Sequence, residues 1–293
     1  MPVTLQTSRS LLFCPGNRLE VIAKTPRSAP DAIVIDLEDA VAPPEKPDAR
    51  ATATSGAAAL AQIGSSSLRL LRVNGPETPW HEDDLVQLRE DAWQGVVVPK
   101  VEDPAQLRLV RRRLAGLGRP ELAVLAGLET AAGVAEARAL AAVADAVYFG
   151  AEDFITDLGG VRTPGNLEVL YARSAVVLAA RLGDAPALDQ IVADHGDSER
   201  FRREAEEARS LGYTGKLCIH PGQVPLANAA FLPTAEEVDR ARRLVAAYEA
   251  AAAERRGAID FEGEMVDRPL YLRALTLLQR ASAHERAGAG GPR

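Results

Sequence analysis

Short apolar runs alternate with longer stretches of helical pattern along most of this sequence, and the alternation occurs eight times. The apolar runs lie at residues 11–14, 33–35, 68–73, 96–98, 122–126, 146–149, 187–192 and 216–219. They are nearly continuous in apolar residues, which is typical of strands buried on both faces of a parallel sheet. Helical patterns lie between them, at residues 17–24, 46–63, 81–91, 103–116, 132–143, 167–182 and 198–211. Eight β-then-α units predict an α/β fold that closes into a (β/α)8 barrel, the TIM barrel.

The chain of 293 residues is long enough for one barrel and a smaller addition. We assign residues 1–232 to the barrel domain. Residues 233–286 contain two amphipathic helical patterns and form a predicted C-terminal helical extension. Residues 287–293 are rich in glycine and alanine, and we expect this tail to be disordered.

Charge and composition exclude several classes of partner. The formal net charge is −7 and the basic residues are dispersed, which argues against nucleic acid and anionic membranes as partners. No apolar run is long enough to span a membrane, and the first ten residues lack the apolar core of a secretory signal. These features favour a cytoplasmic protein. Cys14 and Cys218 each lie inside an apolar run, so we expect buried, unreactive thiols instead of a disulfide or a zinc site.

Residues 31–46 contain three carboxylates immediately after an apolar run. Asp36, Glu38 and Asp39 fall on one short turn, where like charges repel and burial on one side removes water. A metal ion, an arginine or the counter-cations of an anionic substrate could neutralise such a cluster. The alternative is a solvated acidic turn, with Asp39 near the N-cap of the following helix. In a barrel the carboxyl ends of all strands share one face, so this turn is expected to meet polar groups from other strands.

Glu129 and Asp153 each follow a different predicted strand, and both can point into the mouth of a barrel. Two carboxylates without a nearby histidine or cysteine suit Mg²⁺, which prefers oxygen ligands and retains several waters. Glu152 competes with Asp153 for the role of ligand. The alternative for these acidic residues is favourable charge at the N-terminus of a helix.

Two basic residues also follow predicted strands. Arg72 is the strongest candidate for holding a substrate carboxylate, because its planar fork matches that anion. It can also form an ion pair with the acidic turn. Lys100 is either a Schiff-base lysine or a charge partner, and the presence of a candidate metal site favours the second role.

Four basic residues near the N-terminus suggest a second kind of contact. Arg9, Arg18, Lys24 and Arg27 form a small basic cluster in an otherwise acidic chain. Such a cluster can meet a phosphorylated ligand, although a solvated helix face is the alternative.

Several motifs together resemble the citrate lyase β-subunit family of the wider HpcH/HpaI aldolase/citrate lyase group, which includes malyl-CoA and citramalyl-CoA lyases. They cover nearly the whole chain in order: R-S-L-L-F-C-P-G-N-R (9–18), D-x4-D-L-E-D-A-V with K-x2-A-R (31–50), R-V-N (72–74), P-K (99–100), E-T (129–130), F-G-A-E-D (149–153), G-K-x-C-I-H-P-x-Q (215–223) and M-V-D-x-P (265–269). The resemblance implies a (β/α)8 barrel that assembles as a homotrimer or hexamer. It also implies Mg²⁺-dependent retro-Claisen cleavage of a 3-hydroxyacyl thioester.

The resemblance also implies roles for single residues. Glu129 and Asp153 would bind Mg²⁺, with Glu129 close to the substrate, and Arg72 would hold the oxo-acid portion. Contacts with the CoA or acyl-carrier arm would come from three residues, Phe13, Arg18 and Lys24. Asp267 would be an acid/base group that reaches the active site of the neighbouring subunit, to which the C-terminal extension would attach. Asp36, Glu38 and Asp39 would order the mouth and the Arg72 side chain.

The motifs leave the substrate open. The preferred hypothesis is cleavage of a citryl-CoA or citryl-carrier thioester to an acetyl thioester and an oxo acid such as oxaloacetate, with transferase and acyl-carrier subunits as possible partners. Cleavage of malyl-CoA or citramalyl-CoA, or the reverse condensation of acetyl-CoA with glyoxylate, is the nearest alternative. A metal-dependent aldolase that acts without CoA and a catalytically silent carrier-binding subunit are more distant ones.

Overall fold

The computed structural model of the protein describes residues 4–288. The chain divides into two compact units, one ending at Phe231 and the other beginning at Leu232. None of the helices in the described part of the chain combines the length and apolar character needed to cross a bilayer.

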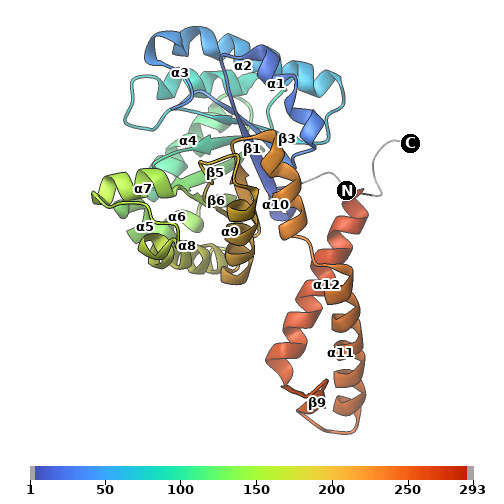
Figure 1. Ribbon diagram of the computed structural model, residues 1–293. Coiled ribbons are helices and arrows are strands. Elements are labelled where there is room, and N and C mark those ends of the chain that lie inside the picture. Colours follow the sequence, from blue (N-terminus) through green and yellow to red (C-terminus); the bar gives the residue numbers. More distant parts are fainter. Residues whose placement is uncertain (1–3, 289–293) are drawn as a thin grey trace. The chain divides into compact units, whose positions relative to one another are not determined.

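The first unit is a closed barrel of eight parallel strands, paired in chain order (Figure 1). The strands are β1 (Ser10–Pro15), β2 (Ala32–Asp36), β3 (Leu68–Arg72), β4 (Gly95–Val98), β5 (Ala123–Leu128), β6 (Ala146–Phe149), β7 (Ala187–Asp189) and β8 (Gly215–Cys218). Pairing of β8 with β1, in the register Leu11 to Leu217, closes the barrel. The predicted TIM barrel is therefore confirmed.

Helices connect the strands and cover the outside of the barrel (Figure 1). They are α1 (Leu19–Ile22), α2 (Lys46–Gln62), α3 (His81–Val86), α4 (Pro104–Gly116), α5 (Ala131–Ala135), α6 (Ala137–Ala141), α7 (Ala151–Leu158), α8 (Leu170–Leu182), α9 (Ser198–Leu211) and α10 (Val224–Ala230). Asp103 is the N-cap of α4, as predicted, and its side chain accepts a hydrogen bond from Ala105 N–H.

Two helix predictions were wrong in detail. The helix predicted to begin at residue 17 begins at Leu19, and the Asn17 side chain donates to Glu45 instead of capping it. The helix predicted at residues 132–143 is two short helices, which meet at Glu136. Helix α7, which begins two residues after β6, was not predicted.

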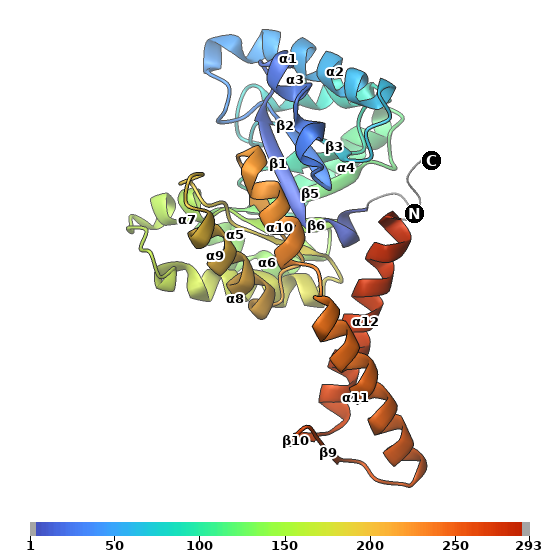
Figure 2. The same cartoon turned by 45° about the vertical axis from the view of Figure 1, so that its right-hand side comes forward.

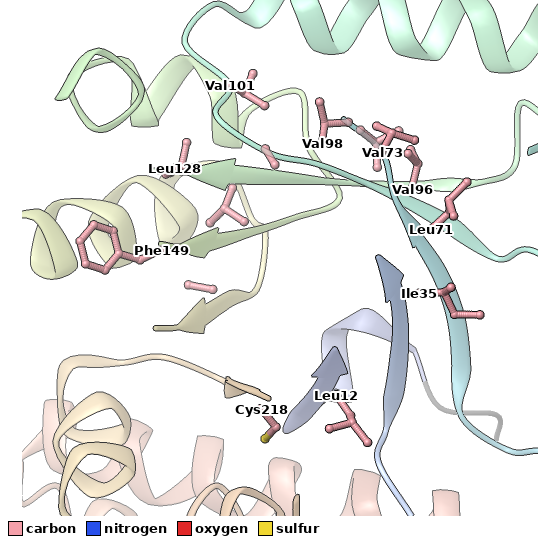
Figure 3. Close-up of a cluster of buried hydrophobic side chains, with 14 of the residues drawn as sticks. Leu12, Ile35, Leu71, Val73, Val96, Val98, Val101, Leu128, Phe149 and Cys218 are labelled. Carbon is pink, nitrogen blue, oxygen red and sulfur yellow. The ribbon is translucent and has the colours of Figure 1, made fainter. Parts of the chain in front are cut away.

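Alternate strand residues face opposite sides of the sheet and build two apolar layers. The outer layer packs under the helices and includes Leu12, Ile35, Leu71, Val96 and Phe149, which Figure 3 draws on β1, β2, β3, β4 and β6. The inner layer fills the barrel with the residues in between, namely Leu11, Val34, Leu70, Val97, Leu125, Tyr148, Leu188 and Leu217. A residue in phase with the inner layer therefore points into the barrel.

Both cysteines are buried among these apolar residues, as predicted. Burial raises the pKa of Cys14 and of Cys218 to about 12. Because the thiolate is the reactive form, these thiols are unreactive at neutral pH.

The second unit is a helical hairpin (Figure 2). It contains α11 (Ala235–Ala253), β9 (Ile259–Phe261), β10 (Glu264–Val266) and α12 (Arg268–Gly288). Its two helices pack through a small apolar core of Ala241, Leu244, Tyr248, Val266 and Ala274. Helix α12 continues two residues into the predicted tail, and the rest of that tail, residues 289–293, lies outside the described residues.

Candidate active site

A cavity of about 340 Å³ lies at the carboxyl ends of the barrel strands. Its lining comes from residues at or just beyond the ends of seven of the eight strands: Phe13, Cys14, Pro15, Asp36, Asp39, Ala40, Arg72, Glu129, Tyr148, Gly150, Ala151, Glu152, Asp153, Ile191, Leu217 and Ile219. This is the face on which TIM-barrel proteins carry their active sites. The expected convergence of polar groups is therefore present in the fold.

Asp36 and Arg72 form the first fixed pair of the site. They are the last residues of β2 and β3 and lie opposite each other in the sheet register. Arg72 Nε and Nη2 donate to Asp36 Oδ1 and Oδ2 over 2.6 and 2.7 Å. Burial acts to raise the pKa of Asp36, but the Arg72 guanidinium outweighs it, and this pKa lies below its usual value. The predicted ion pair between Arg72 and the acidic turn is confirmed.

The remaining edge of Arg72 is directed at other groups. Nη1 lies 2.9 Å from Glu38 Oε2, and the guanidinium lies 5.0 Å from the centre of the Phe13 ring. The two hydrogen bonds to Asp36 use only two of the five N–H groups of the Arg72 guanidinium. Arg72 thus retains donors for a ligand, although contact with a substrate stays a prediction.

Two of the three carboxylates of the acidic turn are buried. Asp36 and Glu38 are 1% and 5% exposed, whereas Asp39 is largely exposed. The next helical turn begins only at Pro43, so Asp39 is not near an N-cap. The alternative of a solvated acidic turn is therefore wrong for Asp36 and Glu38.

Lys100 connects three carboxylates. Its Nζ lies 2.6 Å from Glu38 Oε1, 3.2 Å from Asp39 Oδ2 and 3.5 Å from Asp153 Oδ1. Burial acts to lower the Lys100 pKa, but the bond to Glu38 outweighs it and raises the pKa above its usual value. A Schiff base needs the neutral amine, so the structure favours the role of charge partner.

The Lys100 backbone is held in a left-handed conformation, with φ of 51°, which is uncommon for a residue other than glycine. This conformation accompanies a second contact, in which Lys100 N–H donates to Glu129 Oε2 over 2.8 Å. The strained residue therefore contacts the acidic turn through its side chain and Glu129 through its backbone.

Glu129 follows β5 and is 2% exposed. Burial, followed by the charges of Glu38 and Asp153, raises its pKa to about 7. Gly150 makes room for it, because a Cβ at Gly150 would fall 2.5 Å from Glu129 Cγ. A carboxylate held in this environment is destabilised until a cation or a proton neutralises it.

Glu152 and Asp153, the competing ligand candidates, have different partners. Glu152 Oε1 pairs with Arg162 Nε at 3.0 Å. Asp153 faces Lys100 and is one of the charges that raise the Glu129 pKa. The geometry therefore favours Asp153 over Glu152 as the companion of Glu129.

The donor set fits a hard divalent cation. Within the described part of the chain, five carboxylates, namely Asp36, Glu38, Asp39, Glu129 and Asp153, outnumber the cations near them, which are Arg72, Lys100 and, behind the acidic turn, Lys46. Among the described residues, no three histidine, cysteine or acidic side chains converge to form a complete metal cage. Two carboxylates with open positions are what Mg²⁺ uses when water and substrate supply its other ligands.

The basic cluster is not one group in the structure. Arg9 precedes β1, at the end of the barrel opposite the cavity, where its guanidinium forks onto Asp31 at 2.8 Å. Arg18 is exposed and pairs with Glu20, and Lys24 and Arg27 are exposed. Of the residues predicted to contact the carrier arm, Phe13 lines the cavity. The prediction that Arg9 belongs to a ligand-binding cluster was wrong, because its charge serves a structural pair.

Asp267 belongs to the second unit. It is half-buried and lies between β10 and α12, directly before the helix. Its role as an acid/base group stays a prediction.

A buried network behind the acidic turn was missed. Lys46, at the start of α2, is 4% exposed, and its Nζ donates to the carbonyl oxygens of Leu37 and Glu38 over 2.8 Å. It also donates to Asn74 Oδ1 over 2.6 Å. The network fixes the backbone that carries Glu38. The motifs K-x2-A-R and R-V-N contain both residues, so the signal was present in the sequence.

The Glu129 pKa gives a prediction for cation binding. A carboxyl group must lose its proton to bind a cation, so protons compete with Mg²⁺ below pH 7 and cease to compete above it. We expect Mg²⁺ affinity to fall by up to about tenfold for each pH unit below 7 and to level off above pH 8. Calorimetric titration at pH 6, 7 and 8 measures this, and equal affinities at the three values would contradict it.

The fold and the cavity together define a TIM-barrel protein with a site suited to a hard divalent cation. Comparison with known proteins identifies the group. The chain belongs to the HpcH/HpaI aldolase/citrate lyase family, whose sequence pattern matches residues 9–221. The family resemblance inferred from the motifs is thereby confirmed.

Three relatives illustrate the similarity. A citrate lyase subunit beta-like protein of Deinococcus radiodurans is 53% identical over 274 residues, which cover 92% of this chain and 96% of the relative. A (3S)-malyl-CoA thioesterase of Cereibacter sphaeroides is 33% identical over 277 residues, covering 94% and 95%. The crystal structure of protein CitE from Mycobacterium tuberculosis in complex with magnesium, acetoacetate and coenzyme A is 33% identical. It matches with a TM-score of 0.80 and covers 95% of this chain and 100% of that one.

Proposed function

We propose that the protein is a Mg²⁺-dependent carbon–carbon lyase that cleaves a 3-hydroxyacyl thioester into an acetyl thioester and an oxo acid. The preferred substrate type is a citryl-CoA or citryl-carrier thioester, which would yield oxaloacetate. The observation that carries the proposal is the pair Glu129 and Asp153, set beside Arg72 in a cavity with an excess of carboxylates. The magnesium, acetoacetate and coenzyme A bound to the Mycobacterium tuberculosis relative support it.

Each of the polar residues of the cavity would have its own role in this reaction. Glu129 and Asp153 would hold Mg²⁺, which, when bound, acts as a Lewis acid on the hydroxyl oxygen that becomes the ketone. Arg72 would hold the carboxylate of the acid with the N–H groups that Asp36 leaves free. Lys100 keeps Glu38 and Asp39 neutralised without forming a covalent bond. Asp36 and Glu38 fix the orientation of Arg72.

Cleavage also requires that a proton be returned to the α-carbon of the acetyl thioester. Asp267 is proposed for this step, as an acid/base group supplied by a neighbouring subunit in a homotrimer or hexamer. In such an assembly, turnover would depend on association of the subunits.

The thioester arm is proposed to enter past Phe13, with Arg18 and Lys24 near its phosphates. The coenzyme A bound to the Mycobacterium tuberculosis relative supports a CoA arm. An acyl-carrier arm, with separate transferase and carrier subunits, is the other form of the same proposal.

The cavity also supports a second candidate. Its wall from β7 and β8 is apolar, formed by Ile191, Leu217 and Ile219. A hydrogen or a methyl group on the oxo acid fits this wall better than a carboxymethyl group, which favours malyl-CoA or citramalyl-CoA. The similarity to a (3S)-malyl-CoA thioesterase agrees with this choice. Condensation of acetyl-CoA with glyoxylate would be the reverse reaction at the same site.

One assay tests the proposal. The purified protein is incubated with Mg²⁺ and citryl-CoA, malyl-CoA or citramalyl-CoA in parallel, with a chelator control. We expect chelator-sensitive release of acetyl-CoA from one of the three, which also identifies the acid. If none is cleaved although Mg²⁺ binds, the CoA form of the proposal fails, and the same assay with carrier-linked substrates tests the other form.

A further inference from the structure

Tyr148 is a cavity residue to which the proposed reaction assigns no role. It lies on β6, points into the barrel with the inner layer and lines the floor of the cavity. The residue is 1% exposed, and its hydroxyl group lies beside the Glu129 carboxylate without the geometry of a complete hydrogen bond. Buried tyrosine hydroxyls are normally hydrogen-bonded, so this hydroxyl group has a donor to offer to a molecule bound in the cavity.

A glycine in the neighbouring strand makes room for the Tyr148 side chain. Gly127 lies opposite Tyr148 in the register of β5 and β6. A Cβ at Gly127 would fall 2.4 Å from the Tyr148 hydroxyl oxygen and 3.0 Å from Glu129 Oε2. The tyrosine ring therefore leans over a position without a side chain, and its hydroxyl and the Glu129 carboxylate border the same small space.

Hydrogen-bond acceptors predominate around that space. Glu129, Glu38 and Asp36 offer carboxylate oxygens, and part of the Arg72 guanidinium is taken up by Asp36. A tyrosine hydroxyl has an ordinary pKa of about 10, so it carries its proton at neutral pH. Tyr148 thus offers an uncharged O–H donor beside the site assigned to the cation.

We propose that the Tyr148 hydroxyl donates a hydrogen bond to an oxygen atom of the oxo acid bound in the cavity. The inference rests on the proposed function, because it requires that an oxo acid binds here. It assigns to Tyr148 a direct contact with substrate and product, separate from the contacts of Arg72 and the cation.

The test is Tyr148→Phe, which removes the hydroxyl group and keeps the ring. With Mg²⁺ present, calorimetry should show pyruvate and oxaloacetate affinities about tenfold weaker than in the wild type, the loss expected for one hydrogen bond to a charged group. Binding of Mn²⁺ alone, followed by electron paramagnetic resonance, should change by less than about twofold. Unchanged oxo-acid affinity would overturn the proposal.

Tyr213→Phe is the matched control. Tyr213 is also fully buried, but its hydroxyl donates to the Arg173 carbonyl at 3.0 Å, outside the cavity. This variant should lose thermal stability and keep its oxo-acid affinity. Loss of Mn²⁺ binding in Tyr148→Phe would also overturn the proposal, because the hydroxyl would then support Glu129 and not the acid.

A second measurement does not depend on a folded variant. In a crystal structure of the wild type with Mg²⁺ and pyruvate, the Tyr148 hydroxyl should lie within about 3 Å of a pyruvate oxygen. A wild type that binds neither oxo acid would refute the proposed function together with this contact. If the wild type binds an oxo acid and Tyr148→Phe binds it with the same affinity, the result would refute the Tyr148 contact and leave the proposed function standing.

Discussion

Replacing Glu129 with glutamine is expected to weaken Mg²⁺ binding by at least about 100-fold and to remove chelator-sensitive turnover. Loss of a group that merely orients a metal ligand costs 10- to 100-fold, so loss of a ligand itself costs more. The variant keeps the shape of a side chain that Gly150 and Lys100 N–H enclose. It also removes a buried carboxyl group whose pKa is about 7, so folding should not suffer. Calorimetry and thermal melting measure the two effects.

Two companion variants make the result specific. Asp153→Asn should match Glu129→Gln, because Asp153 is the proposed second ligand. Glu152→Gln should bind Mg²⁺ nearly as the wild type does, because Glu152 pairs with Arg162. A loss in Glu152→Gln equal to that in Asp153→Asn would contradict the assignment of the ligand pair.

Replacing Asp267 with alanine should leave Mg²⁺ affinity unchanged and lower kcat by about 100-fold or more, the contribution typical of a general acid or base. The physical reason is that the α-carbon of the acetyl thioester would lose its proposed proton donor, while the two proposed metal ligands, Glu129 and Asp153, remain. The lyase assay and calorimetry on the same preparation measure the two quantities. Wild-type turnover in this variant would refute the role.

The position of Asp267 directly before α12 requires a control, because an aspartate there can cap the helix. Asparagine caps about as well as aspartate but transfers no proton. Asp267→Asn should therefore keep the melting temperature and lose turnover as Asp267→Ala does. Asp260→Ala changes an exposed carboxylate of the same hairpin and should leave turnover intact. Full activity in Asp267→Asn would reduce Asp267 to a helix cap.

Sequence periodicity predicted the barrel and part of the site, for one physical reason. Strands buried on both faces are apolar throughout, so their eightfold recurrence is visible without tertiary information. Arg72 is in phase with Leu68 and Leu70, and Asp36 is in phase with Val34, so both had to point inward once the barrel closed. The convergence of Asp36, Arg72 and Glu129 followed from the fold class.

Other features of the site depend on distances that no local pattern contains. The choice between Glu152 and Asp153 required the position of Arg162, ten residues beyond Glu152. The sequence placed Arg9 in a basic cluster with Arg18, Lys24 and Arg27. Its ion pair with Asp31 lies at the end of the barrel opposite the cavity, and no local pattern predicts that contact. Tyr148 is in phase with Ala146 and could have been found from periodicity. The surroundings of its hydroxyl group could not, because they depend on Gly127 in the neighbouring strand.

Closure of β8 onto β1 has a consequence for biosynthesis. Phe13 and Leu217 come from the first and last strands, and both line the cavity. A chain still emerging from the ribosome cannot complete this pocket until β8 is available. Ligands of the pocket therefore bind, and by mass action stabilise, only chains whose barrel has closed. A ligand that binds there would in this way favour finished molecules over nascent ones.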